Sequence, residues 1–354
     1  MVTVRTNPPR QTDEPPPRLN PDPVGVLLGL LAPRRRSLPV HVRILPCAVS
    51  EGRLPDIDDD VRRRLTRRFG VGVSAWFAEL PDALDALRDR WQIKFGPVFP
   101  QGSMSVVIRC RLPDGRAAVL KVSPDRARLA NEAAALATWA TGPVPSVVAV
   151  DERLGALLIE AIEPGTPLTE VATVPAPATV AELLNALHDT GATDRPFPPL
   201  SQRIAHLFDS GATLYDHHPE LIVPIPPELY ERGRRLANRL AGDAAPPRLL
   251  HGDLTPRNIL DGGDTRGLVA IDPAPCFGDA AFDAVDLVFW RATDTETIAA
   301  RAQEMAPAIG STGTRVLDWC RAFAAMVALE LAASSTASEP GVGALLTLAD
   351  EARA

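Results

Sequence analysis

The sequence predicts an α+β fold of two lobes, in which a small antiparallel sheet is followed by a mainly helical part. The first observation behind this prediction is a change of hydrophobic period at Gln92, after which short β-like runs alternate with turn sequences. The second is a single helical pattern inside this region, and the third is the helical periodicity that dominates after residue 163. The predicted strands cover residues 93–99, 104–111, 117–122, 146–151 and 156–162.

Three helices are predicted in the first lobe. The first begins after Asp58, Asp59 and Asp60, because acidic side chains stabilise a helix N-terminus. The second follows directly, and the third interrupts the strands from about residue 125 to 140. The apolar positions at helical spacing are Val61, Leu65 and Phe69 in the first helix, Phe77, Leu80, Leu84 and Leu87 in the second, and Leu129, Ala133, Leu136 and Trp139 in the third.

We divide the chain into three parts. Residues 1–55 form a Pro- and Arg-rich arm with little periodic apolar pattern, which we expect to be disordered. Residues 56–162 form the lobe with the sheet, and residues 163–354 form the helical lobe. A chain of 354 residues is long enough to give each lobe its own core.

Composition limits the possible partners. The net charge of −7 argues against nucleic acid and permits a small molecule that is neutral or cationic. No apolar run approaches the roughly 20 residues of a membrane span, and the apolar run 24–31 precedes its basic cluster, the reverse of a secretory signal. The four cysteines lie far apart without metal-site spacing, so we expect reduced, mostly buried thiols in a cytoplasmic protein.

The motif from His251 to Asn258 carries the chemistry, and Asp272 follows it. Phosphoryl transfer of the kinase type needs a group that orients the attacking hydroxyl and ligands for Mg²⁺ beside the triphosphate. Asp253 suits the first function, while Asn258 and Asp272 offer the oxygen ligands that a hard divalent cation prefers. Predicted strands at residues 248–250 and 268–271 flank these loops.

Three features upstream complete a nucleotide site. Of the 37 basic residues only Lys94 and Lys121 are lysines, and Lys121 ends a predicted strand, where a compact charge can meet phosphates. Glu132, eleven residues later on the predicted helix, can pair with Lys121. The turn at Gly102 and Ser103 offers backbone N–H groups to phosphates. Taken singly, these residues also fit a surface lysine, a solvated glutamate and an ordinary hairpin turn.

The joint order of turn, strand Lys, helix Glu, HxDxxxxN motif and downstream Asp is that of the two-lobed protein-kinase-like fold. Several residues nevertheless differ from those of protein kinases. Gly252 replaces the usual Arg, Thr255 replaces Lys, and Asp272 is followed by Pro273 rather than Phe-Gly. Protein substrates are therefore not expected.

The chain resembles the aminoglycoside phosphotransferase superfamily, and within it the branch of streptomycin 6-phosphotransferases and hydroxyurea phosphotransferases. The similarity runs from about residue 62 to 333, and the segments that carry it are 118–124, 131–136, 155–160, 250–254, 258–260 and 270–273. The resemblance implies ATP and Mg²⁺, with Asp253 as the catalytic aspartate and Asn258 and Asp272 as metal ligands. It also implies that Glu160 to Ile162 form a hinge whose backbone meets the adenine. One departure is Thr255, where that branch typically has His.

Four further residues are given other roles. Asp279 is expected to cap a helix, with contact to a cationic substrate as the alternative. Asp283 resembles the helix aspartate that braces the catalytic loop in related kinases. His188 is expected to be a packed helix residue. Glu330 is expected to be an exposed helix residue, with a position facing the substrate cleft as the alternative.

The resulting hypothesis is an ATP-dependent kinase that phosphorylates a hydroxyl of an aminoglycoside-like or hydroxyurea-like small molecule, a reaction that can confer antibiotic resistance. One alternative is a kinase for a metabolic alcohol or amino-alcohol, such as choline or homoserine, and another is a nucleotide-binding pseudoenzyme. Substrate contacts are expected from the helices after residue 178 and from a loop around residues 196–226. No motif indicates an oligomeric state.

Overall fold

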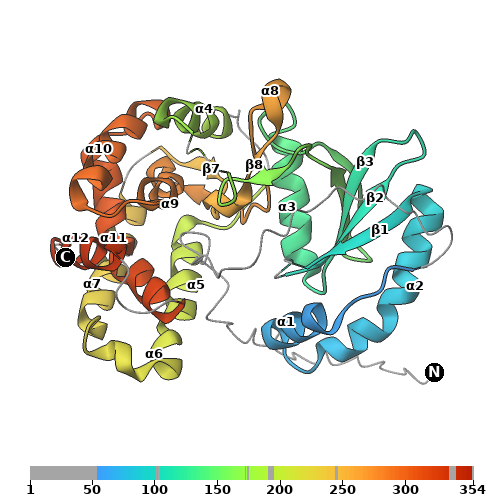
Figure 1. Ribbon diagram of the computed structural model, residues 1–354, viewed down its shortest axis with the longest axis horizontal. Helices are drawn as coiled ribbons and strands as arrows, with labels where there is room; N and C mark the ends of the chain where they lie inside the picture. The colour runs from blue at the N-terminus through green and yellow to red at the C-terminus, as the bar shows by residue number, and fades with distance from the viewer. Residues whose placement is uncertain are drawn as a thin grey trace, which may run out of the picture.

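A computed structural model describes residues 54–352, apart from 101, 103, 172, 174, 190–194, 244–245 and 335–339. Nearly all of the predicted arm, together with Ser103 and Cys47, lies outside the described residues. Figure 1 shows a lobe built around a sheet beside a mainly helical lobe, as the sequence predicts.

Five antiparallel strands form the sheet of the first lobe, in the order β1-β2-β3-β5-β4. All five lie where they were predicted, to within two residues at each end, because short apolar runs bounded by turn residues favour strands. Their bounds are Lys94–Phe99 (β1), Val106–Arg111 (β2), Ala117–Val122 (β3), Val147–Asp151 (β4) and Ala156–Glu160 (β5).

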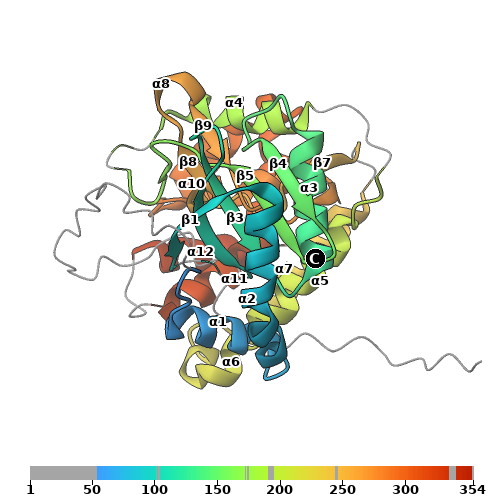
Figure 2. The ribbon, with the colours of Figure 1, turned by 90° about the vertical axis from the view of Figure 1, so that its right-hand side faces the viewer.

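Helices cover the two faces of this sheet. Helix α2 (Val73–Trp91) lies on the outer face, in front of the strands in Figure 2, and helix α1 (Asp59–Phe69) packs beside it. Asp58 caps α1 by accepting a hydrogen bond from the backbone N–H of Val61 at 2.8 Å. Helix α3 (Arg126–Thr138) lies on the inner face and shares its core with the helical lobe. The three predicted helices are confirmed.

The alternation of side chains along β3 decides which of them face the helical lobe. Leu120 and Val122 belong to the outer core, under α2. Lys121 points to the opposite face, toward α3, because successive side chains of a strand alternate. The position of Lys121 in the strand therefore places its ammonium group on the inner face of the sheet, which contacts the helical lobe.

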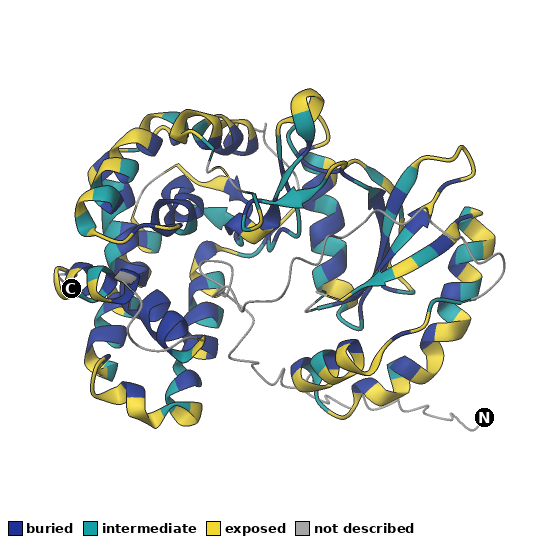
Figure 3. Cartoon of the chain, viewed as in Figure 1, coloured by how far each residue is buried: buried dark blue, intermediate teal, exposed yellow. Residues whose placement is uncertain are grey.

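The helical lobe is organised around α11 (Gly313–Ser334), which is buried on all sides between residues 322 and 332. The other helices are α4 (Pro177–His188), α5 (Leu200–Ala212), α6 (Leu214–His217), α7 (Pro227–Gly242), α8 (Gly263–Arg266), α9 (Val285–Phe289), α10 (Thr295–Met305) and α12 (Pro340–Asp350). Figure 3 shows buried positions concentrated where α11 meets its neighbours. A helix that is apolar all round belongs in the interior of a lobe. No helix within the described ranges has the length and apolar character needed to cross a bilayer.

Two predictions about this lobe are wrong. Glu330 is 6% exposed rather than solvated, because the helix that carries it is enclosed. The stretch 196–226 is not a loop but contains α5, α6 and a 3₁₀ turn, Pro219–Ile222. Its helical character comes from apolar side chains at helical spacing, which are buried on one face of α5: Leu200, Ile204, Leu207 and Phe208.

Short strands support the motif loops between the lobes. Strand β7 (Arg248–Leu250) pairs with β10 (Cys276–Gly278). Strand β8 (Ile259–Asp261) lies between β6 (Thr166–Pro167) and β9 (Leu268–Ala270). The loop from His251 to Asn258 runs from β7 to β8, so both of its ends are held by strand pairing.

Candidate active site

The loop after β7 makes a turn that only glycine accommodates. Gly252 has a φ of +75°, and a Cβ atom built on it would lie 2.0 Å from the carbonyl oxygen of Ala274. Any larger residue would therefore clash with backbone as well as adopt a strained conformation. The clash explains why this position holds glycine rather than the arginine that protein kinases usually carry there.

Asp283 holds the backbone of this loop in place, as predicted. Its carboxylate accepts hydrogen bonds from the backbone N–H groups of His251 at 2.8 Å and Gly252 at 2.9 Å. It also contacts Nε2 of His188 at 2.9 Å. Burial alone would raise the pKa of Asp283, but the contacts with His188, His251 and Gly252 hold it below its usual value. His188 is buried on α4, as expected, and its contact with Asp283 was not foreseen.

His251 is a neutral structural residue. Its Nε2 lies 3.0 Å from the carbonyl oxygen of Ile271, and its Nδ1 lies 3.3 Å from the backbone nitrogen of Asp253. The first contact needs a donor and the second an acceptor, which fits one neutral tautomer. Burial lowers the pKa of His251, consistent with this assignment. The ring also stacks on Trp139 of the first lobe, with centroids 6.3 Å apart.

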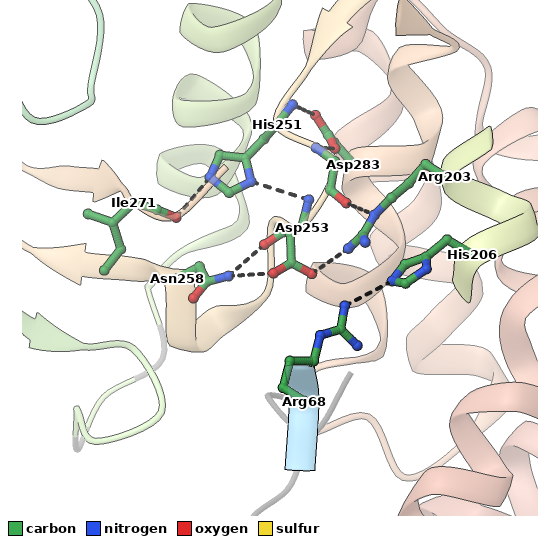
Figure 4. A network of polar contacts seen from close by, with 9 residues as sticks. Arg68, Arg203, His206, His251, Asp253, Asn258, Ile271 and Asp283 are labelled. Carbon is green, nitrogen blue, oxygen red and sulfur yellow. Dashed lines mark hydrogen bonds and ion pairs between the residues drawn. The ribbon is translucent and has the colours of Figure 1, made fainter. Parts of the chain in front are cut away.

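The Asp253 carboxylate is held at both oxygens. Oδ1 accepts a hydrogen bond from Nη2 of Arg203 at 2.9 Å, and Oδ2 accepts one from Nδ2 of Asn258 at 3.0 Å. Arg203 also donates through Nε to the carbonyl oxygen of Gly252 at 2.8 Å. Figure 4 shows the carboxylate between these two side chains. Asp253 is thus fixed in orientation while its side chain remains 23% exposed.

Arg203 was not found from the sequence. It lies on α5, a helix without a recognisable motif, fifty residues before Asp253. The start of α5 is fixed to β10 through a hydrogen bond of 2.8 Å from the backbone N–H of Phe277 to the carbonyl oxygen of Pro198. Because β10 pairs with β7, this contact positions Arg203 over the motif loop. Only the tertiary arrangement brings these segments together.

Lys121 joins the two lobes. Its ammonium donates to Glu132 on α3 and to Asp272 in the helical lobe. Burial alone would lower the pKa of Lys121, but the two carboxylates raise it, so the side chain stays charged. The predicted pairing with Glu132 is therefore present, and the contact with Asp272 brings both halves of the predicted site into one cluster.

Asn258 lies beside the segment that leads to Asp272, because the backbone N–H of Ile271 donates to the carbonyl oxygen of Asn258 at 2.8 Å. Asn258 uses Nδ2 to hold Asp253, and Figure 4 shows its Oδ1 pointing away from that residue. Asp272 has a φ of +59°, an unusual conformation for a residue with a side chain, and its side chain is 44% exposed. Asn258 is buried whereas the side chain of Asp272 is partly exposed, and the oxygens of both side chains are of the chemical type that a divalent cation prefers.

The other residues predicted to meet the nucleotide are Gly102 and the segment 160–162. Gly102 lies between β1 and β2, as predicted, and its carbonyl oxygen accepts a hydrogen bond from Nε of Arg64 at 3.1 Å. Glu160 ends β5, and its carboxylate contacts Arg266 and the backbone N–H of Ser146. Its side chain is thus committed, and Ile162 is buried, so nucleotide contacts from this segment would come from backbone atoms.

A small pocket opens beside Asp253 on the side of the helical lobe. Its walls include Arg203, Leu207, Phe282, Asp286 and Phe323. Asp279 is not one of them: it caps the turn that follows β10 by accepting from Ala281 at 3.0 Å, as predicted. It also accepts hydrogen bonds from Arg315 and Trp319, both at 2.7 Å.

Comparisons with known proteins identify the family of the chain. The sequence model of a family described as aminoglycoside/hydroxyurea antibiotic resistance kinases matches residues 90–334. Streptomycin 6-kinase of Streptomyces glaucescens is 28% identical over 254 residues, which are 70% of this chain and 77% of that protein. Hydroxyurea phosphotransferase of Kitasatospora aureofaciens is 28% identical over 224 residues, or 61% and 63% of the two chains.

A solved structure supports the fold. The aminoglycoside phosphotransferase APH(4)-Ia, crystallised with AMP-PNP and hygromycin B, superposes with a TM-score of 0.51 at 15% identity. The match covers 75% of this chain and 95% of that one. At this identity the comparison establishes the shared two-lobed kinase-like fold.

Proposed function

Because the chain belongs to the family of aminoglycoside/hydroxyurea antibiotic resistance kinases, we propose that it transfers the γ-phosphate of ATP to a hydroxyl of an aminoglycoside-like or hydroxyurea-like acceptor. The observation that carries the proposal is a pair of contacts: Lys121 of the first lobe donates to Asp272 of the helical lobe, and Asn258 donates to Asp253 within the motif loop. A natural purpose of such a reaction is inactivation of an antibiotic.

Asp253 is the proposed catalytic residue. Its carboxylate would accept a hydrogen bond from the acceptor hydroxyl, orient the oxygen toward the γ-phosphorus and take up the proton. The new bond forms between the acceptor oxygen and the γ-phosphorus, the bond to the β,γ-bridging oxygen breaks, and ADP leaves. Holding the carboxylate at both oxygens supports this role because the reacting geometry is set before the acceptor binds.

Lys121 and Glu132 are the proposed phosphate-binding pair. Lys121 is buried and charged, and Glu132 fixes its ammonium at the inner face of the sheet. We propose that this ammonium contacts the α- and β-phosphates, that the turn at Gly102 and Ser103 covers the phosphates, and that the backbone of Glu160 and Ile162 meets the adenine.

Asn258 and Asp272 are the proposed ligands of Mg²⁺. The donor set fits, since one amide oxygen and one carboxylate beside the phosphate-binding lysine match the preference of Mg²⁺ for few protein ligands plus phosphates. Bound Mg²⁺ supplies positive charge that offsets the negative charge of the phosphates during transfer.

The proposal is tested by incubating the protein with ATP, Mg²⁺ and either streptomycin or hydroxyurea and recording the mass of the acceptor. We expect a mass increase of one phosphoryl group on at least one of them, dependent on Mg²⁺. Binding of ATP without transfer to any hydroxyl-bearing acceptor, including choline and homoserine, would favour the pseudoenzyme.

We expect Arg203→Met to lower kcat by about ten- to hundredfold, with little change in the KM for ATP. Arg203 is a positioning residue: without it, one oxygen of Asp253 and the carbonyl oxygen of Gly252 lose their donor. Arg203→Lys should restore part of kcat, since it keeps the charge but not both hydrogen bonds. The exposed Arg235→Met serves as a control. A rise in KM for ATP at unchanged kcat would contradict this role.

A further inference from the structure

We propose that Arg68 is a positioning residue, which holds the turn between β1 and β2 against α5 and thereby keeps that turn aligned with Asp253. This inference rests on the proposed function, because it concerns the geometry of the same reaction. Arg68 lies near the end of α1, a helix that precedes residues 90–334, the part of the chain that the family model matches.

Helix α1 contacts the turn between β1 and β2 at two points. Nε of Arg64 donates to the carbonyl oxygen of Gly102 at 3.1 Å, and Nε of Arg68 lies 3.1 Å from Sδ of Met104. The two arginines are four residues apart, so they lie on the same face of α1. Oγ of Ser123, the residue after β3, donates to the carbonyl oxygen of Met104 at 2.7 Å. The turn that is proposed to cover the phosphates is therefore held by both α1 and β3.

The same guanidinium group contacts α5 of the helical lobe. Nη2 of Arg68 lies 3.5 Å from Nε2 of His206, and Figure 4 shows the two side chains pointing toward one another. Arg68 is only 8% exposed, so this contact is largely shielded from water. A guanidinium group only donates, so Nε2 of His206 must accept, which requires a neutral ring. Burial, followed by the charge of three neighbouring arginines, lowers the pKa of His206 to about 4, which keeps the ring neutral at neutral pH.

His206 lies one turn of α5 away from Arg203. The two residues are three positions apart, so their side chains lie on the same face of the helix. Arg203 donates to Oδ1 of Asp253 at 2.9 Å. Because both side chains extend from one helix, a displacement of α5 would move Arg203 together with His206. The contact between Arg68 and His206 thus connects the turn between β1 and β2 with the proposed catalytic carboxylate.

Another contact between the lobes uses groups that the nucleotide would occupy. In the structure, Lys121 donates to Asp272 across the lobes. In the proposed reaction Lys121 contacts the phosphates and Asp272 contacts Mg²⁺, so both groups exchange this contact for their ligands. Arg68 and His206 use no group that is assigned to nucleotide or metal. Their contact can therefore persist when nucleotide is bound, and it would keep the two lobes aligned at that stage.

Hydrogen–deuterium exchange of the full-length protein, with and without the non-hydrolysable analogue AMP-PNP and Mg²⁺, tests this role. We expect the nucleotide to slow exchange in β1 and β2 of the wild type and also in α5, which is joined to the turn through Arg68. Arg68→Met keeps a long side chain but removes the guanidinium group. It should reduce the slowing in α5 by about fivefold or more, the lower end of typical coupling between sites, while slowing in β1 and β2 remains.

Variants of His206 examine the same contact from the side of the helical lobe. His206→Leu removes the acceptor and should reproduce the loss in α5. His206→Gln places an amide oxygen near the position of Nε2 and should restore most of the wild-type slowing. The double variant of Arg68→Met and His206→Leu should lose no more than either single variant, because both remove one contact. The exposed Arg67→Met on α1 is the matched control and should behave like wild type.

Thermal unfolding shows whether the variants are folded. A folded Arg68→Met in which AMP-PNP slows α5 as in wild type would overturn the role of Arg68 and leave the proposed function untouched. If Arg68→Met does not fold, the same criterion applies to His206→Leu. A wild type in which AMP-PNP slows exchange in neither lobe would overturn the proposed nucleotide site together with this role. Coupled slowing in a wild type that phosphorylates neither streptomycin nor hydroxyurea would support the role of Arg68 and overturn those acceptors.

Discussion

Asp253→Ala is expected to lower kcat for phosphoryl transfer by roughly a thousandfold, within the 10²–10⁴-fold range of a positioned acid–base group. The variant loses the group that orients the acceptor hydroxyl and takes its proton. The KM for ATP should change little, because Lys121 and Asp272 remain. Initial rates with a saturating acceptor, measured beside nucleotide binding by fluorescence titration, separate the two effects.

Two further variants complete this experiment. Asp253→Asn keeps the size of the side chain but has a far weaker proton acceptor, and it should be nearly as inactive as Asp253→Ala. Asp264→Ala removes an exposed aspartate from α8 in the same lobe and should retain wild-type activity. Retention of more than about a tenth of wild-type kcat by Asp253→Ala would show that another group performs this step.

Asp283→Ala should lower the free energy of unfolding by about 3–5 kcal/mol and reduce transfer as well. The substitution leaves the backbone N–H groups of His251 and Gly252 buried without an acceptor and removes the partner of His188. Since these groups set the path of the loop that carries Asp253, losing their hydrogen bonds should also lower the rate of phosphoryl transfer. Urea denaturation followed by circular dichroism measures the change in stability.

The stabilisation by Asp283 should also depend on pH in a defined direction. The pKa of Asp283 is lower in the folded protein than its usual value. The charged carboxylate therefore stabilises the fold fully above the unfolded pKa of about 4, and this contribution is lost as the pH falls through the folded pKa.

Asp283→Asn isolates this charge. The stability difference between wild type and Asp283→Asn should stay constant from about pH 6 to 8 and shrink below about pH 4. The exposed Asp264→Asn on α8 should show no such convergence. A difference that instead grew toward acid pH would contradict the assigned ionisation of Asp283.

Some parts of the site can be read from local sequence because they depend on chemical type and short spacing. Asp253 and Asn258 lie five residues apart in one loop, and the hydrogen bond between their side chains follows from that loop. Lys121 and Glu132 lie on consecutive elements, and the alternation of a strand puts Lys121 on the face that α3 covers. Asp279 was expected to cap a helix because it precedes one, and it does.

Other parts depend on the packing of distant helices. Arg203 contacts Asp253 because a backbone hydrogen bond joins the start of α5 to β10. No sequence motif indicates this contact. Glu330 was expected to be exposed, since charged helix residues usually are, yet α11 is enclosed by the rest of its lobe. Helical periodicity cannot reveal such burial when every face of the helix is covered.

The sequence by itself determined the fold class, the succession of strands and helices in the first lobe, and the motif residues of the proposed ATP site, because these follow from hydrophobic period and residue chemistry. Only the tertiary structure brought Arg203 onto the carboxylate of Asp253 and Lys121 onto Asp272. The physical reason is that ion pairs and hydrogen bonds form only between groups that are close in space. The packing of the two lobes determines which groups are close.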